Sequence, residues 1–234
     1  MWAVSCLLQN GFTCGAHTAQ DYSVQTHSLT QANTTESVIY SYVALHTEHQ
    51  ACLFLSSLHP RLQFASQAVK SLQIEPNVRL YTTVQVLQIC QGLTRLVLRA
   101  LPQTPGRSSA LIDALDGLPL TSLSIHLSLL YNTAAISLPS LSVFHRVVDL
   151  EIRDHWALWG STLHLEHLHQ LTHLSVYFST QRTQPAFIQL ILQACENLQV
   201  IVLRTNEAPG TVHQCLQRAN LLDQHVVIFS KSFG

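Results

Sequence analysis

The chain has 234 residues and a formal net charge of -1, and its pI is about 6.9. This near-zero net charge excludes the strongly basic composition of proteins that bind nucleic acid or anionic membranes. Charged residues make up only 11%, against about 25% in an average soluble domain, so Ser, Thr, Gln, Asn and the 14 histidines must cover much of the surface. Such low charge suits a subunit that binds another protein.

The first 36 residues are rich in Gln, Thr, Ser, His and Ala and have no sustained periodicity. We expect residues 1–36 to be a poorly ordered leader and residues 37–234 to be one domain. The apolar start of the chain has no Lys or Arg before it, which makes a poor signal peptide. The six cysteines contain no Cys-x-x-Cys pair. We therefore expect an intracellular protein, cytoplasmic or nuclear; a secreted one would carry a glycosylation acceptor at Asn33.

The first regular element is expected at residues 37–45, where β-branched and aromatic residues predict an edge strand. Thr47 and Gln50 then form a capping box for a helix, because the pair satisfies free amides at a helix start. Ala51, Leu55 and Leu58 follow at helical spacing. His59 precedes a proline, so the helix is expected to end there.

From residue 69 onward, one pattern recurs: apolar-x-x-apolar-x-apolar. Its middle residues are separated by 24, 27, 27, 24 and 27 positions, and they are Leu72, Leu96, Leu123, Leu150, Leu174 and Ile201. A strand pattern at this period is typical of leucine-rich repeats. A further strand is expected at 225–229, with Ile228 lying 27 residues after Ile201.

Helix-like segments are expected between the strands, at 83–91, 109–116, 185–195 and 211–219, with an irregular stretch at 134–144 and a short one at 163–168. Right-handed crossovers between parallel strands place such segments on one side of a sheet. The sequence therefore predicts an α/β fold. More specifically, it predicts a leucine-rich-repeat-like solenoid, with a parallel strand array on one face and helices or irregular segments on the other.

Five segments resemble the repeat region of F-box proteins from mushroom-forming fungi: Ala44–Leu58, Ala68–Ile74, Leu93–Leu98, Leu171–Val176 and Ala194–Leu203. The resemblance covers about residues 37–230. It implies a substrate-binding arm of a ubiquitin ligase. The family's F-box opens with a Leu-Pro-x-Glu type segment, which residues 1–36 do not contain. Binding of the ligase adaptor is therefore expected only if an F-box is missing from this sequence.

Side chains that flank the later anchors of each strand should point away from the core, because side chains alternate along a strand. The expected protein-binding face consists of Arg95, Arg99, His126, Asp149, Glu151, Arg153, His173, Tyr177 and Arg204. The five strands that carry these residues offer roughly 400 Å², about half of one side of a standard interface. We expect a non-enzymatic recognition scaffold that uses this face and nearby loops to bind a protein, without a cofactor.

The alternative function is a small metal-binding or hydrolytic protein that uses the dense histidines between positions 164 and 173. Imidazoles are good zinc ligands, and His164, His167 and His169 are the candidates, with Glu166 between them. However, the chain has no His-Glu-x-x-His motif, no Gly-x-Ser-x-Gly elbow and no glycine-rich phosphate loop. Surface histidines are therefore the simpler interpretation.

Two further groups have a structural and a functional interpretation. The carboxylates of Asp149, Glu151 and Asp154 lie close together in the sequence, and a cross-strand charge network accounts for them. Trp156 and Trp159 are expected in a loop, either as a plug over the end of a repeat or as an aromatic anchor for a partner.

Overall fold

The computed structural model describes residues 36, 38–99, 108–131, 137–155, 163–221 and 225–230. The chain divides into two compact units, Met1–Glu36 and Ser37–Gly234. Apart from Glu36, the expected leader lies outside the described residues, and so do Trp156 and Trp159. The fold described below is that of the second unit.

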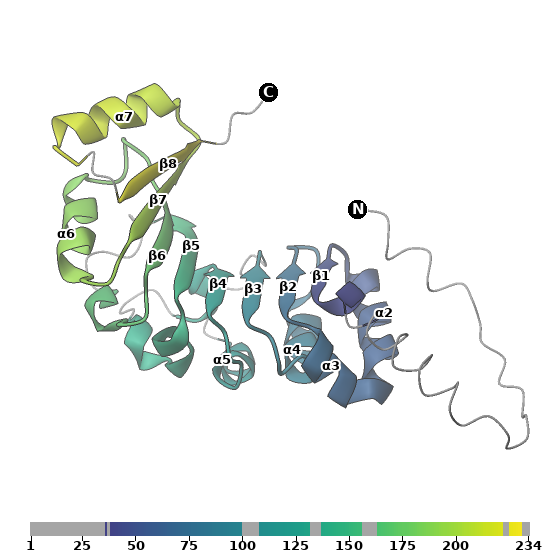
Figure 1. Cartoon of the computed structure of the whole chain (residues 1–234). Helices are drawn as coiled ribbons and strands as arrows, with labels where there is room; N and C mark the ends of the chain where they lie inside the picture. Colours follow the sequence, from purple (N-terminus) through teal and green to yellow (C-terminus); the bar gives the residue numbers. More distant parts are fainter. Residues whose placement is uncertain are drawn as a thin grey trace, which may run out of the picture. The chain divides into compact units, whose positions relative to one another are not determined.

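The second unit contains a sheet of eight strands, all parallel, each paired with the strand that follows it in the chain (Figure 1). The strands are β1 (Tyr42–Leu45), β2 (Ser71–Ile74), β3 (Arg95–Leu98), β4 (Ser122–Ile125), β5 (Asp149–His155), β6 (His173–Tyr177), β7 (Val200–Thr205) and β8 (Val226–Ser230). Because neighbouring parallel strands cannot be joined by a hairpin, a crossover segment separates each pair.

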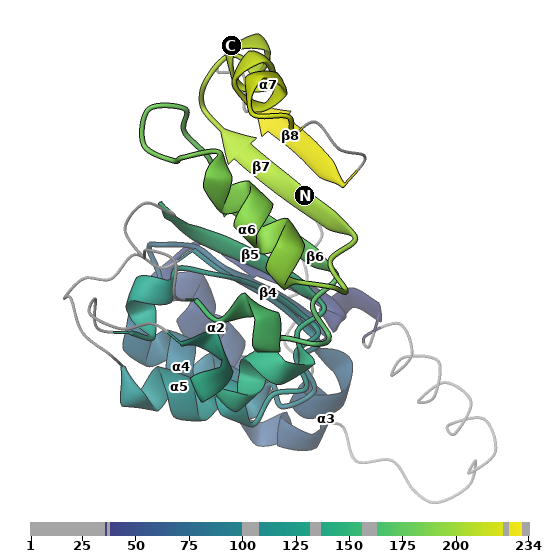
Figure 2. The ribbon, with the colours of Figure 1, turned by 90° about the vertical axis from the view of Figure 1, so that its left-hand side faces the viewer.

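The crossovers hold the helices. These are α2 (Glu48–Leu58), α3 (Leu62–Ala68), α4 (Leu80–Ile89), α5 (Ser109–Asp116), α6 (Ala186–Ala194) and α7 (Pro209–Arg218). Short 3-10 helices are η1 (His59–Arg61), η2 (Leu127–Leu129), η3 (Leu138–Ser140), η4 (Ser142–Arg146) and η6 (Leu165–His167). Helix α4 contacts both α2 and α5 in a row beside the first strands (Figures 1 and 2). The predicted α/β class with a parallel sheet is confirmed.

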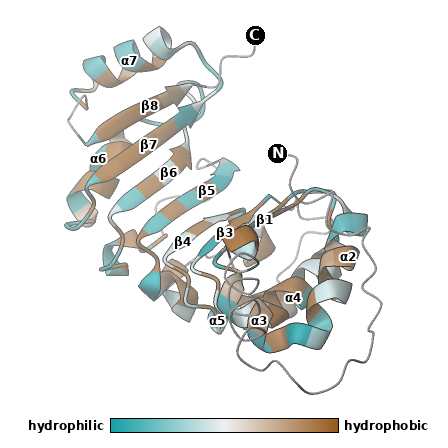
Figure 3. Ribbon diagram, turned by 45° about the vertical axis from the view of Figure 1, so that its right-hand side comes forward, coloured by the Kyte–Doolittle hydropathy of each residue, from teal (hydrophilic) through white to brown (hydrophobic). Residues whose placement is uncertain are grey.

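The recurring apolar frame forms the core. Parallel pairing places Leu72 beside Leu96, Leu96 beside Leu123 and so on to Ile201. All 18 frame residues are buried, and they are Val69, Leu72, Ile74, Leu93, Leu96, Leu98, Leu120, Leu123, Ile125, Val147, Leu150, Ile152, Leu171, Leu174, Val176, Leu198, Ile201 and Leu203. Alternating brown and teal bands along β5 and β6 show the same period in hydropathy (Figure 3). One face of the sheet is therefore apolar throughout.

A second repeating contact lies two residues before each central anchor from Leu72 to Leu174. The backbone carbonyl oxygen at this position accepts two N–H groups from the next repeat; that of Thr94, for example, accepts from Thr121 at 2.8 Å and from Ser122 at 3.1 Å. Equivalent carbonyls belong to Lys70, Thr121, Val148 and Thr172. The hydroxyls of Thr94 and Thr121 also donate to the preceding carbonyl, at 3.2 and 3.3 Å. This ladder fixes the spacing between neighbouring repeats.

The predicted start of α2 is confirmed, but its expected stop is followed by a helix that was not predicted. The Thr47 hydroxyl accepts a hydrogen bond from the backbone N–H of Gln50 at 3.2 Å, and the Gln50 side chain accepts from the backbone of His46 at 2.9 Å. Pro60 then lies in the first turn of η1, where its missing N–H costs nothing. The chain therefore resumes as α3, which buries Ala65 and Ala68.

The two outer strands differ from prediction. Strand β1 begins at Tyr42 rather than at residue 37, and Tyr40 is helical. Strand β8 pairs Val226, not Ile228, with Ile201, because the last crossover is two residues shorter than the period of 27 assumes. A shift of two keeps every side chain on its face, so Val226 and Ile228 still pack against the core.

No helix in the described ranges is long and apolar enough to cross a membrane.

Replacement of Leu123 by alanine tests this core. Leu123 is 1% exposed and stacks between Leu96 and Leu150. We expect Leu123→Ala to lower the free energy of unfolding by about 2–5 kcal/mol, measured by urea denaturation. Tyr81→Ala, at a position that is 74% exposed, is the control and should change it by less than about 0.5 kcal/mol. A Leu123→Ala curve that overlays wild type would contradict the arrangement.

Candidate protein-binding face and histidine cluster

Residues that alternate with the buried anchors lie on the sheet face opposite the core, which we call the open face. Register sets them in rows across the sheet. One row is Arg95, Ser122, Asp149, His173 and Val200; the next is Gln73, Val97, Ser124, Glu151, Ser175, Val202 and Val227; and a third contains Tyr177, Arg204 and Phe229. The predicted binding residues on β3 and on β5 to β7 therefore share one surface.

Glu151 is the centre of the polar contacts on the open face. One of its carboxylate oxygens accepts a hydrogen bond from the Ser124 hydroxyl at 2.8 Å. Its other oxygen, Oε1, is 3.0 Å from Nη1 of Arg153 and also forms an ion pair with Nη1 of Arg204. Ser124 and Ser175 are its register neighbours, and their small side chains leave room for both guanidinium groups. Arg204 thus reaches from β7 to β5 across β6.

A second ion pair lies two strands away, between β2 and β3. Nη1 of Arg99 is 3.1 Å from Oε1 of Glu75. The same oxygen accepts a hydrogen bond of 2.6 Å from the amide of Gln73, which in turn accepts one of 3.1 Å from the Tyr42 hydroxyl. These contacts hold Glu75 in place, while the Arg99 side chain keeps 42% of its surface exposed.

The arginines of the two ion pairs act on one another electrostatically. Burial lowers the pKa of Arg153, and the positive charge of Arg99 lowers it further, while Glu75 opposes the change. Burial followed by the charge of Arg99 also lowers the pKa of Arg204. Like charges disfavour each other's charged form. Arg99, which directly follows β3, therefore belongs to one positive cluster with Arg153 on β5 and Arg204 on β7.

Asp154 does not belong to the open face, although its sequence neighbours do. Alternation along β5 places Asp154 on the same side as the buried Leu150 and Ile152, before the pairing with β6 shifts ahead of His155. Asp154 is buried and accepts hydrogen bonds from the backbone of Leu127 and from the Ser128 hydroxyl, the latter at 2.9 Å. Asp154 therefore anchors η2 from the core side, while Glu151 makes cross-strand contacts on the open face.

Two of the predicted face residues are histidines that contact carboxylates. Nδ1 of His126 is 3.6 Å from Asp154, and Nδ1 of His173 is 3.2 Å from Asp149. His173 also contacts the neighbouring Thr172 hydroxyl at 2.7 Å. His173 thus lies on β6 as a partner of Asp149.

The predicted metal candidates are brought together only in part. His164, Glu166 and His167 place one potential ligand atom each within 4.8 Å of one another, while His169 is not in this group. His164 has a left-handed backbone, with φ of 53°, and its Nδ1 lies 3.2 Å from Glu166, whereas Nε2 of His167 lies 3.9 Å away. The backbone N–H of Glu166 and then His164 hold the pKa of this carboxyl below its ordinary value, despite opposition from burial.

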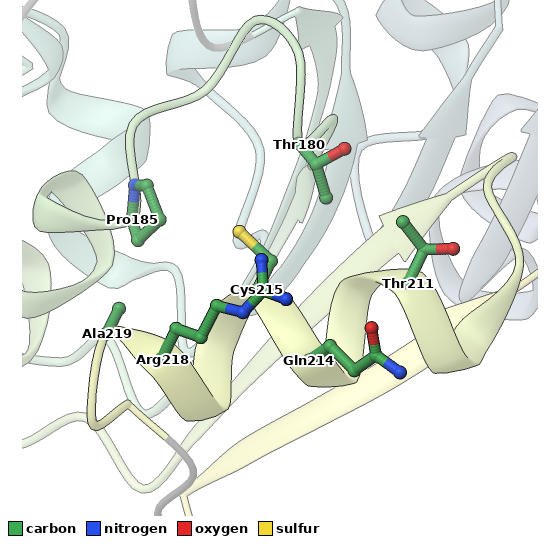
Figure 4. Close-up of a pocket in the computed structure, with 7 residues that line it drawn as sticks. All are labelled: Thr180, Pro185, Thr211, Gln214, Cys215, Arg218 and Ala219. Atoms are coloured by element: carbon green, nitrogen blue, oxygen red, sulfur yellow. The ribbon is translucent and has the colours of Figure 1, made fainter.

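A surface hollow of about 470 Å³ lies beside α7 (Figure 4). Its lining consists of Thr180, Pro185, Thr211, Gln214, Cys215, Arg218 and Ala219. None of these is a carboxylate or a histidine, so the hollow offers no general base of the usual kind.

Two buried cysteines lie outside this hollow. Burial raises the pKa of Cys90 to about 12 and that of Cys195, with help from Glu166, to about 11. Both thiols are therefore poor nucleophiles near neutral pH.

Comparisons of the chain with protein-family models, curated proteins and solved structures give no match. Its function is therefore inferred from its own residues. Sequence reasoning overlooked two of these, Gln73 and Glu75, which extend the open face onto β2. The signal was present, because Gln73 lies between the anchors Leu72 and Ile74, in the same position that Val97 and Glu151 hold in their repeats.

Glu151→Gln tests the polar centre of the face. The change removes the negative charge that two arginines share, so we expect the free energy of unfolding to fall by about 1–3 kcal/mol, and by less in high salt. The measurement is urea denaturation at low and high salt. Asp149→Asn is the matched control, because Asp149 and His173 are each nearly half exposed and such pairs contribute less than about 1 kcal/mol. Equal losses in the two variants would contradict the central role of Glu151.

Proposed function

We propose that this chain is a non-enzymatic protein-recognition scaffold, built as a leucine-rich-repeat-like solenoid whose open face binds a partner protein. The observation that carries the proposal is the ordered array of polar and charged side chains on the face opposite the buried anchors. Arginine and tyrosine side chains of this kind dominate the binding energy of protein interfaces. Strand–helix units at intervals of 24–27 residues support the solenoid.

The open face supplies more than half of the area that a standard protein interface needs. Eight strands at about 4.8 Å spacing and four or more residues long offer roughly 34 by 15 Å, or about 500 Å². A standard interface takes about 800 Å² from each partner, so turns at the strand ends must contribute the remainder. The resemblance to fungal F-box proteins gives the role that we propose for this face, which is to bind substrates of a ubiquitin ligase.

Replacement of Tyr177 or Arg99 by alanine tests the open face. Both side chains are partly exposed and neither belongs to the apolar core. We expect each variant to keep the melting temperature within about 3 °C of wild type, as surface changes usually do. Each should bind a partner captured by the wild-type chain at least fivefold more weakly, measured by titration of the purified partner.

Tyr81→Ala is the matched control for this test, because Tyr81 is exposed on α4 rather than on the sheet. It should retain wild-type affinity. If all three variants bind the partner equally well, the open face is not the binding surface. Turnover by the purified chain that one pocket variant abolishes would contradict the non-enzymatic assignment.

A second candidate function is metal binding, with or without hydrolysis, at His164, Glu166 and His167. The specific observation is that three potential ligand atoms lie within 4.8 Å of one another. Two imidazoles and one carboxylate make a ligand set that zinc uses in catalytic sites, with a position left for water. All three residues are exposed, so the side chains can adjust to the shorter ligand separations of a bound ion.

Zinc titration decides this candidate. If the site binds zinc, competition with a chromophoric chelator gives one equivalent per chain, and His164→Asn or His167→Asn weakens binding at least tenfold. His169→Asn is the control and should leave the affinity unchanged, because His169 is not part of the cluster. If His169→Asn weakens zinc binding as much as the other two variants do, or if the chain binds no stoichiometric zinc, the metal function is wrong.

A further inference from the structure

We propose that Arg99, Arg153 and Arg204 form a receptor for a carboxylate side chain of the partner, an aspartate or glutamate in an acidic segment. The inference rests on the proposed function and names the chemistry that the open face recognises. Its geometric basis is that Arg153 and Arg204 meet at one oxygen of Glu151. Arg99 follows β3 two residues after Val97, which is in register with Ser124 and Glu151, and so it lies in line with Arg153, two residues after Glu151.

Hydrogen-bonding capacity remains within the cluster. A guanidinium group has five N–H donors in a planar fork. Arg153 and Arg204 both direct Nη1 to the same oxygen of Glu151, so they share one acceptor. Nε of Arg99 and Nε of Arg153 are buried and have no hydrogen-bond acceptor in the part of the chain that the structure describes. These two Nε atoms are too buried for a ligand to reach, so a ligand would bind the guanidinium ends of Arg99 and Arg204, whose side chains are 42% and 34% exposed.

Charge indicates which acceptor fits. Three guanidinium groups face two carboxylates, those of Glu75 and Glu151, which leaves one positive charge in excess. A single carboxylate neutralises that excess, and its two oxygens match the guanidinium fork. A phosphate dianion would leave a negative excess beside Glu75 and Glu151, and it would meet repulsion from both. A carboxylate is therefore the better match.

The surroundings of the cluster specify the neighbouring residue of the partner. Register places Tyr177 and Phe229 on either side of Arg204. Val227 and Phe229 are 46% and 55% exposed on β8, and Val227 lies beside Val202. An acidic residue over the arginines would therefore have an apolar neighbour over β7 and β8. The ligand that fits is a segment that alternates acidic and apolar residues.

Binding of defined peptides to the full chain tests the proposal. The probe is a fluorescein-labelled decapeptide of alternating Glu and Leu, compared with peptides that carry Gln or phosphoserine in place of Glu. By fluorescence anisotropy, we expect the Glu peptide to bind at least tenfold more tightly than the Gln peptide and no more weakly than the phosphoserine peptide. The affinity for the Glu peptide should fall as salt rises.

Variants locate the site. Arg153→Gln and Arg204→Gln should each weaken the Glu peptide at least tenfold. Arg218→Gln removes the same charge from α7, outside the open face, where Arg218 is exposed, and should stay within twofold of wild type. Thermal melts confirm that each variant is folded; if Arg153→Gln is not, Arg204→Gln decides the question, since its side chain is 34% exposed.

Three results would overturn the receptor: equal affinity for the Glu and Gln peptides, tighter binding of the phosphoserine peptide, or equal effects of Arg218→Gln and Arg204→Gln. These outcomes are separable from the proposed function. If Tyr177→Ala still weakens the captured partner while Arg204→Gln does not weaken the Glu peptide, the face binds a protein but not through an acidic side chain.

Discussion

The lateral stacking of apolar anchors is the constraint on which the rest of this structure depends. A single strand with its helix has an apolar face that it cannot bury alone, so each unit requires its neighbours. Six central anchors from Leu72 to Ile201 stand side by side in the sheet and are at most 2% exposed. Their burial fixes which side chains of every strand point inward, and therefore which ones point outward.

The open face follows from that constraint. Because alternate residues of each strand are buried in the core, the residues between them lie in straight rows across the sheet. Small residues, Ser124 and Ser175, occupy the places beside Glu151, and long arginines occupy the strand ends. Guanidinium groups carried by non-adjacent strands can then meet at one carboxylate. Hydrogen bonds between charged groups hold these partly desolvated arginines and carboxylates together. The arginines make the centre of the face electrostatically positive.

The sequence predicted those features that periodicity controls. Spacing alone located the strands from β2 to β7 and their core residues, because the apolar residues that repeat in the sequence are the ones that pack in the core. It did not reveal α3, because a proline that ends one helix can also begin the next. The meeting of Arg99, Arg153 and Arg204 was also hidden, because it depends on how long side chains bend across strands.

The carbonyl ladder before each strand has a mechanical consequence. The strand order follows the chain order, so every unit is clamped only to the one before and the one after it. Tension applied to the two ends of the sheet would therefore peel the terminal units first and proceed inward in steps. Each step releases 24 to 29 residues, or about 80–105 Å of extended chain. Under tension, a protein with this connectivity therefore unfolds one terminal unit at a time, while the anchors of the interior units stay stacked.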